Sequence, residues 1–177
     1  MSNWLVKLLG GRSRANPEKA LYEALMERSL SPALYEKGLA EDTFEGRFEA
    51  VTLHSALLMR ALRQFGAPGK ELADGLYKRV FDGFDHALRE RGAGDSSIAR
   101  KIRGLGERYF GLARAVDAAL QAEDPQLELK NVLVKNAIGG GDSDELATYL
   151  RGIEAELSKI DLEAFQKGGV FIADFSA

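Results

Sequence analysis

The sequence predicts an all-α fold, organised as a single irregular bundle of about seven helices with a short extended segment near its C-terminal end. Three observations predict it. Apolar residues recur at intervals of three and four along most of the chain, which is the spacing of one face of a helix. Proline, glycine and capping residues separate these periodic stretches. Neither an alternating strand pattern nor a repeat of about 20 to 50 residues is evident.

The first predicted helix covers about residues 17–28. Asn16 is a favoured N-cap residue, and Pro17 suits the first helical position because its backbone angle is already helical and its missing N–H would be unpaired there. A short helical turn starts at Pro32, and Gly38 ends it in the manner of a C-terminal cap. The chain therefore opens with one helix and one helical turn.

Two long helices follow. Apolar residues from Phe44 to Phe65 keep three- and four-residue spacing, which predicts a helix over 43–65. The sequence Gly66-Ala67-Pro68-Gly69 interrupts this pattern, and a second apolar stripe runs from Leu72 to a helix end near Arg91. Because the connection is short, we expect the two helices to be antiparallel neighbours.

The most regular apolar stripe predicts a helix over 96–122. Asp124-Pro125 opens a sixth helix to about Ile138, and Asp142-Ser143-Asp144 caps a seventh that reaches Leu157. Residues 169–175 do not follow the helical period, so we expect a short strand or an extended strap there.

The chain divides into a short leading segment and one domain. Residues 1–15 are expected to be a flexible or membrane-peripheral segment, and residues 16–177 a single helical domain. Trp4, Leu5, Leu8 and Leu9 favour weak membrane association; a flexible end or a strap on the core is the alternative. No apolar stretch approaches the roughly 20 residues that a membrane-spanning helix needs, and the start of the chain lacks the pattern of a secretory signal.

Composition excludes several kinds of site. The chain has no cysteine, which excludes disulfides, thiolate catalysis and cysteine-bound metal clusters and suits a reducing compartment such as the cytoplasm. His54 and His86 fall on different predicted helices without a metal-ligand spacing, so no metal, no haem and no other cofactor is expected. A net charge of −3 argues against DNA binding.

A catalytic role finds little support in the residues. His54 lies between Val51 and Leu58 on an apolar stripe, and the simplest interpretation is a boundary histidine hydrogen-bonded to a neighbour. An enzyme would need His54 to meet acids such as Asp85 and Asp95 in one pocket. No nucleophile motif or phosphate-binding glycine motif accompanies them. We therefore expect a protein that is not an enzyme.

The middle of the chain is basic. Residues 89–114 contain seven bases and three acids, and the bases give the 96–122 helix one positive side that is either simply solvated or steers a partner. The same helix contains Gly104 and Gly111, each of which costs up to about 1 kcal/mol relative to alanine in a helix interior. We expect close packing against another helix to offset that cost, with the protein's own helices favoured over a partner.

A recognisable motif lies in the same region. Residues 84–95 read Phe-Asp-His-Ala-Leu-Arg-Glu-Arg-Gly-Ala-Gly-Asp, Tyr109-Phe110-Gly111 follows, and Gly46-Arg47-Phe48-Glu49 precedes Leu53-His54. Together these elements resemble the ubiquinol-cytochrome c chaperone family over about residues 43–122. The sequence departs from the family pattern at Ala93, where valine is usual, in the order of the two aromatic residues, and at Leu112, where an arginine is expected. The motif residues are His54, Asp85, Leu88, Glu90, Gly92, Gly94, Asp95, Tyr109 and Gly111.

The resemblance implies a non-enzymatic assembly factor that binds newly made cytochrome b and promotes assembly of the cytochrome bc1 complex. It also implies a cytoplasmic location, peripheral to the inner membrane of a bacterium or on the matrix side of a mitochondrion, and a small assembly partner or the ribosome as further contacts. The alternative is a helical protein-interaction or regulatory module without a dedicated cytochrome b client.

Structural roles alone would also explain the motif. Arg89 and Glu90 are expected to form an ion pair or network that fixes the turn, while Asp95 or Ser96 caps the following helix. Tyr109 belongs to the apolar stripe and is expected in the core, whereas Phe110 lies off it and is a contact candidate. The expected partner-binding residues are Arg89, Arg100, Lys101, Arg103, Arg108 and Phe110.

Overall fold

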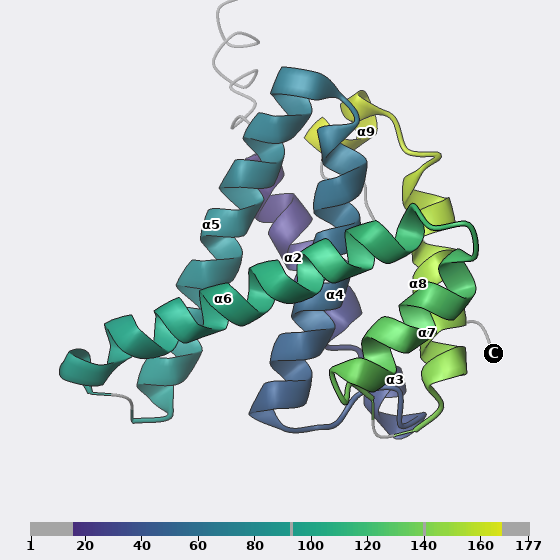
Figure 1. The fold of residues 1–177 in the computed structure, drawn as a ribbon. Helices are drawn as coiled ribbons and strands as arrows, with labels where there is room; N and C mark the ends of the chain where they lie inside the picture. The colour runs from purple at the N-terminus through teal and green to yellow at the C-terminus, as the bar shows by residue number, and fades with distance from the viewer. Residues whose placement is uncertain (1–15, 93, 140, 168–177) are drawn as a thin grey trace, which may run out of the picture.

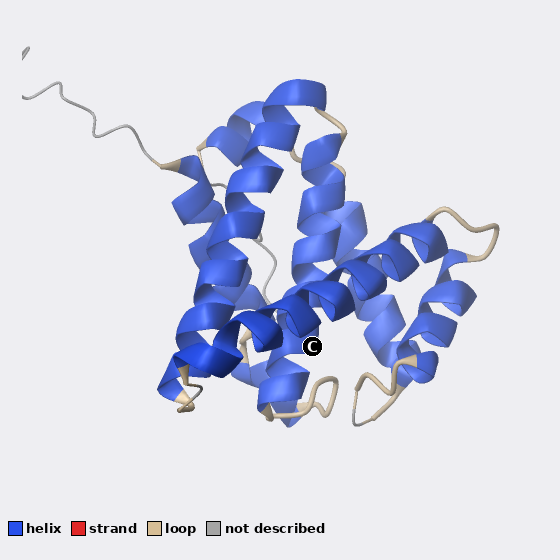
Figure 2. Ribbon diagram, turned by 60° about the vertical axis from the view of Figure 1, so that its left-hand side comes forward, coloured by secondary structure: helices blue, strands red, loops and turns tan. Residues whose placement is uncertain are grey.

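The computed structural model describes residues 16–92, 94–139 and 141–167. Helices and connecting turns make up this part of the chain, without a strand (Figure 2). The predicted all-α class is therefore confirmed. The helices are α2 (Pro17–Ser29), α3 (Pro32–Glu36), α4 (Phe44–Arg63), α5 (Gly66–Glu90), α6 (Asp95–Leu120), α7 (Pro125–Lys135), α8 (Ser143–Leu157) and α9 (Leu162–Gln166).

The seven predicted helical segments correspond to α2 through α8, and α9 is an additional helix that the sequence did not predict. The interpretations of residues 1–15 and of the strap at 169–175 lie outside the described residues. Within the described part of the chain, no helix is long and apolar enough to cross a membrane.

Helix α4 is the centre of the bundle. It packs against α2, α5, α6 and α8, and every residue from 50 to 55 is buried. A helix with neighbours on all sides buries more than one stripe, which explains why Thr52, His54 and Ser55 are buried along with the apolar residues. In Figure 1, α4 and α5 stand side by side, α6 crosses both, and α7 and α8 close the far side.

Side-chain caps begin several of these helices, at the predicted residues Asn16 and Asp142 and at Thr43, which the sequence did not predict as a cap. The Asn16 side chain accepts a hydrogen bond from the Lys19 N–H at 3.0 Å, and the Thr43 hydroxyl accepts one from the Gly46 N–H at 3.0 Å. Asp142 accepts from the N–H of Asp144 at 2.8 Å. Each cap satisfies a backbone donor that the helix itself leaves unpaired.

The connection between α4 and α5 is tighter than predicted. Residues Gly66 to Gly69 were expected to break the helix, but α5 begins at Gly66, whose φ is +64°. A proline within the first turn is compatible with a helix because the first N–H groups have no partner within it. Gly69 is buried against the end of α4, where a Cβ would overlap the carbonyl oxygen of Leu62. Glycine at this position therefore permits the sharp reversal.

The start of α6 differs from the predicted cap. The helix begins at Asp95, and its N-cap residue is Gly94, with φ −72° and ψ 153° and no side-chain cap. The prediction that Asp95 or Ser96 occupies the capping position is therefore wrong. The Ser97 hydroxyl donates to the Gly94 carbonyl at 3.0 Å instead. The preceding turn uses Gly92 at φ +82°, a conformation that glycine adopts without steric cost.

Candidate functional site

The basic side of α6 is an exposed surface at the start of that helix. Arg100, Lys101 and Arg103 are exposed, and among the described residues no acidic side chain lies within ion-pair distance of them. Figure 1 shows the first turns of α6 extending past α5, away from the centre of the bundle. These three cations therefore face solvent on the projecting first turns of α6, where they can attract a negatively charged group.

Two of the predicted partner-binding arginines have partners inside the molecule. Arg108 pairs with Glu49 of α4 at 3.3 Å, and its guanidinium lies 4.9 Å from the centre of the Phe48 ring. Partial burial raises the pKa of Glu49, while the positive charge of Arg108 acts in the opposite direction. Arg89 pairs with Asp85 one turn earlier at 2.6 Å. Arg108 therefore helps to join α6 to α4.

The signature turn is held differently from the expected Arg89–Glu90 pair. Glu90 pairs with His86 at 3.3 Å, and Arg89 with Asp85, both at i,i+4 spacing along α5. Leu88 is buried between these polar residues. Exposed helix pairs of this kind contribute a few tenths of a kcal/mol, so the burial of Leu88 is the larger stabilising contribution in this turn.

Tyr109 and Phe110 have the two environments that the sequence predicted. Tyr109 is 1% exposed, whereas Phe110 is 45% exposed. The Tyr109 hydroxyl lies 3.0 Å from that of Ser55 on α4, and burial raises the pKa of Tyr109 to about 12. The Phe110 ring lies 5.3 Å from that of Tyr77 on α5. The adjacent side chains thus point in different directions, one into the core and one to the surface.

The glycines of α6 do not pack as predicted. A Cβ placed on Gly104 or Gly111 would have no heavy atom within 4 Å outside the helix's own backbone. Close packing against the protein's own helices therefore does not offset their cost in helix stability at these two positions. Gly111 is exposed, next to Phe110, and leaves the backbone of α6 open on that side of the helix.

His54 joins three helices through a buried hydrogen-bond chain that the sequence did not reveal. It is 1% exposed. Its Nδ1 lies 2.7 Å from the Ala50 carbonyl, which can only accept, so Nδ1 carries the proton. Nε2 then accepts from the Tyr149 hydroxyl of α8 at 2.7 Å, and Arg28 of α2 donates to the same hydroxyl at 3.0 Å. The predicted hydrogen bond to a neighbour is confirmed by the bond to Ala50. The predicted place at the boundary of the core is wrong, because packing on several sides of α4 buries His54, and its second partner, Tyr149, lies 95 residues away.

Burial determines the charge of His54. It lowers the pKa of His54 from 6.5 to about 4, with a further lowering contribution from the positive charge of Arg28. The imidazole is therefore neutral at pH 7. Within the described residues, no hydrogen bond or ion pair joins His54 to Asp85, and no group of three or more metal-ligating side chains occurs. The described geometry gives His54 a structural role.

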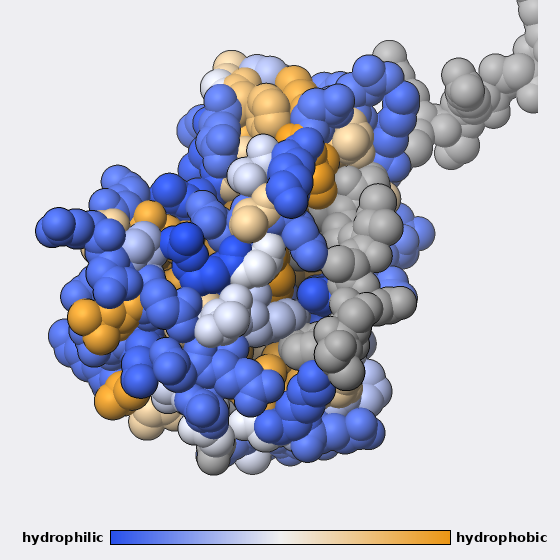
Figure 3. Space-filling view, turned by 90° about the vertical axis from the view of Figure 1, so that its right-hand side faces the viewer, coloured by the Kyte–Doolittle hydropathy of each residue, from blue (hydrophilic) through white to orange (hydrophobic). Residues whose placement is uncertain are grey.

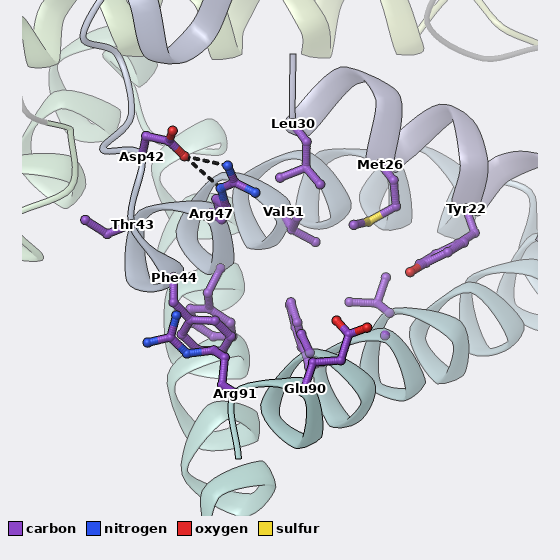
Figure 4. A pocket seen from close by; sticks show the side chains of 15 residues that line it. Tyr22, Met26, Leu30, Asp42, Thr43, Phe44, Arg47, Val51, Glu90 and Arg91 are labelled. Carbon is purple, nitrogen blue, oxygen red and sulfur yellow. Dashed lines mark hydrogen bonds and ion pairs between the residues drawn. The ribbon is translucent and has the colours of Figure 1, made fainter. Parts of the chain in front are cut away.

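An open apolar groove lies between α2, α4 and α5. It has a volume of about 520 Å³. Met26 of α2, Leu30 at the C-terminal cap of α2 and Phe44 of α4 line it (Figure 4). Phe84 lines it from α5. The Asp42–Arg47 ion pair, at 2.7 Å, and Arg91, whose guanidinium lies 5.0 Å from the centre of the Phe44 ring, border the apolar part. The sequence did not predict this groove.

The face that carries α8 differs from the groove in having no continuous apolar surface among the described residues. Figure 3 shows a mostly hydrophilic surface there, with hydrophobic atoms in separate patches. The exposed large apolar residues among those described include Leu127 and Val134 of α7. Scattered apolar residues of this kind are ordinary on a protein surface, so the groove and the exposed bases of α6 remain the distinctive surfaces of the described part of the chain.

An all-helical bundle with a projecting basic helix, a half-exposed aromatic residue and an apolar groove has the features of a protein-binding protein. The ubiquinol-cytochrome C chaperone family model matches residues 38–173, and the chain belongs to this family. The match extends well beyond the motif region at 43–122. Among curated proteins, no significant sequence match occurs.

A solved structure supports the same assignment. The chain is similar to the Cbp3 homolog from Brucella abortus, with 26% sequence identity and a TM-score of 0.81 over 96% of this chain and 97% of that one. Family membership and this likeness together support a chaperone role in assembly of the cytochrome bc1 complex.

Proposed function

We propose that the protein binds newly made cytochrome b and promotes assembly of the cytochrome bc1 complex, without catalysing a reaction. The observation that carries the proposal is the family match over residues 38–173, which includes the whole α4–α8 core. The proposed place of action is the cytoplasmic surface of the inner membrane, where the client is made, and a small assembly partner or the ribosome is a further candidate contact.

The basic side of α6 is the proposed client-facing surface. Arg100, Lys101 and Arg103 are exposed, and Phe110 provides a half-exposed apolar ring on the same helix. Charged groups at the rim of an interface mainly accelerate association, whereas desolvated aromatic residues mainly slow dissociation. Arg108 contributes to this surface while also holding α6 to α4 through Glu49.

Charge reversal tests this assignment. The double variant Arg100→Glu, Arg103→Glu is expected to recover less cytochrome b in a pull-down from cells that are making the bc1 complex, because it removes the steering charge. The melting temperature must equal that of the wild type. The matched control is Lys135→Glu, Lys159→Glu, which reverses two exposed bases away from α6 and changes the net charge equally.

Each outcome has a defined meaning. Normal recovery with the folded α6 variant would place the client elsewhere on the molecule. Reduced recovery of cytochrome b with both double variants would assign the effect to net charge and not to the basic side of α6. A cell that lacks the gene should accumulate less assembled bc1 complex and more unassembled cytochrome b, and normal levels of both would refute the assembly role and favour a regulatory interaction module.

A further inference from the structure

The apolar groove between α2, α4 and α5 is a built feature of the fold. Helices α2 and α5 run parallel here, since Glu18 of α2 lies near Arg79 of α5 and Tyr22 lies beside Gly83. A Cβ on Gly83 would come within 2.5 Å of the Tyr22 hydroxyl, so the helices are in close contact at that level. Beyond it, the space lined by Met26 and Leu30 opens toward the start of α4 (Figure 4).

The lining favours an apolar occupant. Met26, Leu30, Phe44 and Ala87 are only partly buried although they are apolar and contiguous. A volume of about 520 Å³ lies within the range of about 300–1,000 Å³ that binding pockets have. An apolar segment that fills the groove would remove this surface from water, at a gain of about 25 cal/mol per Å².

We propose that residues 4–9 of this same chain occupy the groove. This segment, Trp-Leu-Val-Lys-Leu-Leu, contains five apolar residues out of six and precedes the helix that forms one wall of the groove. The proposal goes beyond the assembly role. It concerns the isolated protein, so its failure and the failure of cytochrome b capture are separate results.

The length of the chain before α2 allows residues 4–9 to reach the groove. Met26 and Leu30 lie ten and fourteen residues after Asn16, or roughly 15 and 21 Å along α2 at 1.5 Å per residue. Leu9 lies seven residues before Asn16, and an extended chain of that length spans roughly 23 Å. A chain that folds back beside α2 therefore places Leu9 and the residues before it at the groove.

Charge favours the same arrangement. Residues 1–15 contain Lys7, Arg12 and Arg14 and no acid. Glu23 and Glu27 are exposed on α2, next to the stripe that lines the groove. A basic segment that runs back along α2 would lie near these two carboxylates, of which Glu23 also pairs with Lys19 at 3.5 Å, and the attraction would weaken as salt is added.

The single tryptophan of the chain provides the test, because Trp4 lies within the proposed occupant. In the full-length protein its emission should be blue-shifted and poorly quenched by acrylamide, at any protein concentration. Ala87→Glu places a charge in the groove and should increase the quenching constant several-fold. Ala67→Glu makes the same change at an exposed position on the same helix and should leave quenching unaltered.

Disulfide cross-linking tests where residues 4–9 lie. The chain has no natural cysteine, so an introduced pair of cysteines can react only with each other. The variant Leu8→Cys, Ala87→Cys should form an intramolecular disulfide on mild oxidation, whereas Leu8→Cys with Thr148→Cys on the exposed side of α8 should not. Solvent-exposed Trp4 emission in the wild type would overturn the proposal. So would emission insensitive to Ala87→Glu, binding of Trp4 to lipid vesicles in preference to the groove, or disulfides found only between two molecules.

Discussion

The buried His54 makes the stability of the protein depend on pH in a way that can be calculated. Its pKa in the folded protein is about 4, against 6.5 for the ordinary group. Below pH 6.5 the unfolded chain therefore binds a proton that the folded protein does not, and the free energy of unfolding falls with falling pH until about pH 4. The loss amounts to about 2 kcal/mol between pH 8 and pH 5, and about 3.4 kcal/mol at its limit.

The two histidines of the chain allow a clean measurement. Urea denaturation followed by circular dichroism at pH 8, 7, 6 and 5 gives the free energy of unfolding of the wild type, His54→Gln and His86→Gln. The wild type and His54→Gln differ only at this buried imidazole, so the difference between their pH dependences isolates its contribution. His86 is exposed and lies beside Glu90 on the surface, so His86→Gln is the control for replacing an imidazole outside the core.

His54→Gln should be less stable at pH 8, because it disturbs the hydrogen bonds to Ala50 and Tyr149, but should lose about 2 kcal/mol less than the wild type on acidification. Equal losses in the wild type and in His54→Gln would refute the reasoning. They would show that the imidazole is accessible to protons in the folded protein.

Three further changes test the packing. Gly69→Ala should destabilise the protein by about 1–3 kcal/mol because its Cβ would overlap the Leu62 carbonyl, measured as a lower urea midpoint at unchanged slope; an unchanged midpoint would contradict the tight α4–α5 turn. Gly104→Ala, with nothing within 4 Å, should instead stabilise by up to about 1 kcal/mol, and a loss would reveal a hidden contact. Tyr109→Phe should cost about 1 kcal/mol by removing the hydrogen bond to Ser55, and wild-type thermal stability would show that this bond contributes nothing.

The spacing of apolar residues was sufficient to predict most of the helices, because a helix that packs on one side has apolar residues at intervals of three and four. The stripe from Ile98 to Leu120 predicted α6 to within a residue or two at each end. Helix α9 was not predicted, because a helix of five residues is too short to show the helical spacing of apolar residues. Its sequence signals are Asp161, which caps it, and the fully buried Phe165, whose ring lies 5.9 Å from that of Phe65.

The surface features were predictable only where one helix carries them. The exposed bases of α6 and the opposite environments of Tyr109 and Phe110 follow from position on a single helix. The bond between His54 and Tyr149 and the apolar groove depend on how helices distant in sequence pack together, and helical periodicity carries no information about that. The glycines illustrate the same limit, since Gly69 permits a close approach whereas Gly104 faces open space.

The arrangement of α6 has a consequence for hydrogen exchange. Its second half is held by α4, through Tyr109 to Ser55 and through the Arg60–Asp117 ion pair, whereas Ser96, Ala99 and Arg100 in its first half are exposed. Amide protons near the start of the helix should therefore exchange by local fraying, at a lower free energy than those after Tyr109. Ile98 and Leu105 still bury their side chains in the core, so we expect this fraying to involve only the first turn or two of α6 while the bundle stays folded.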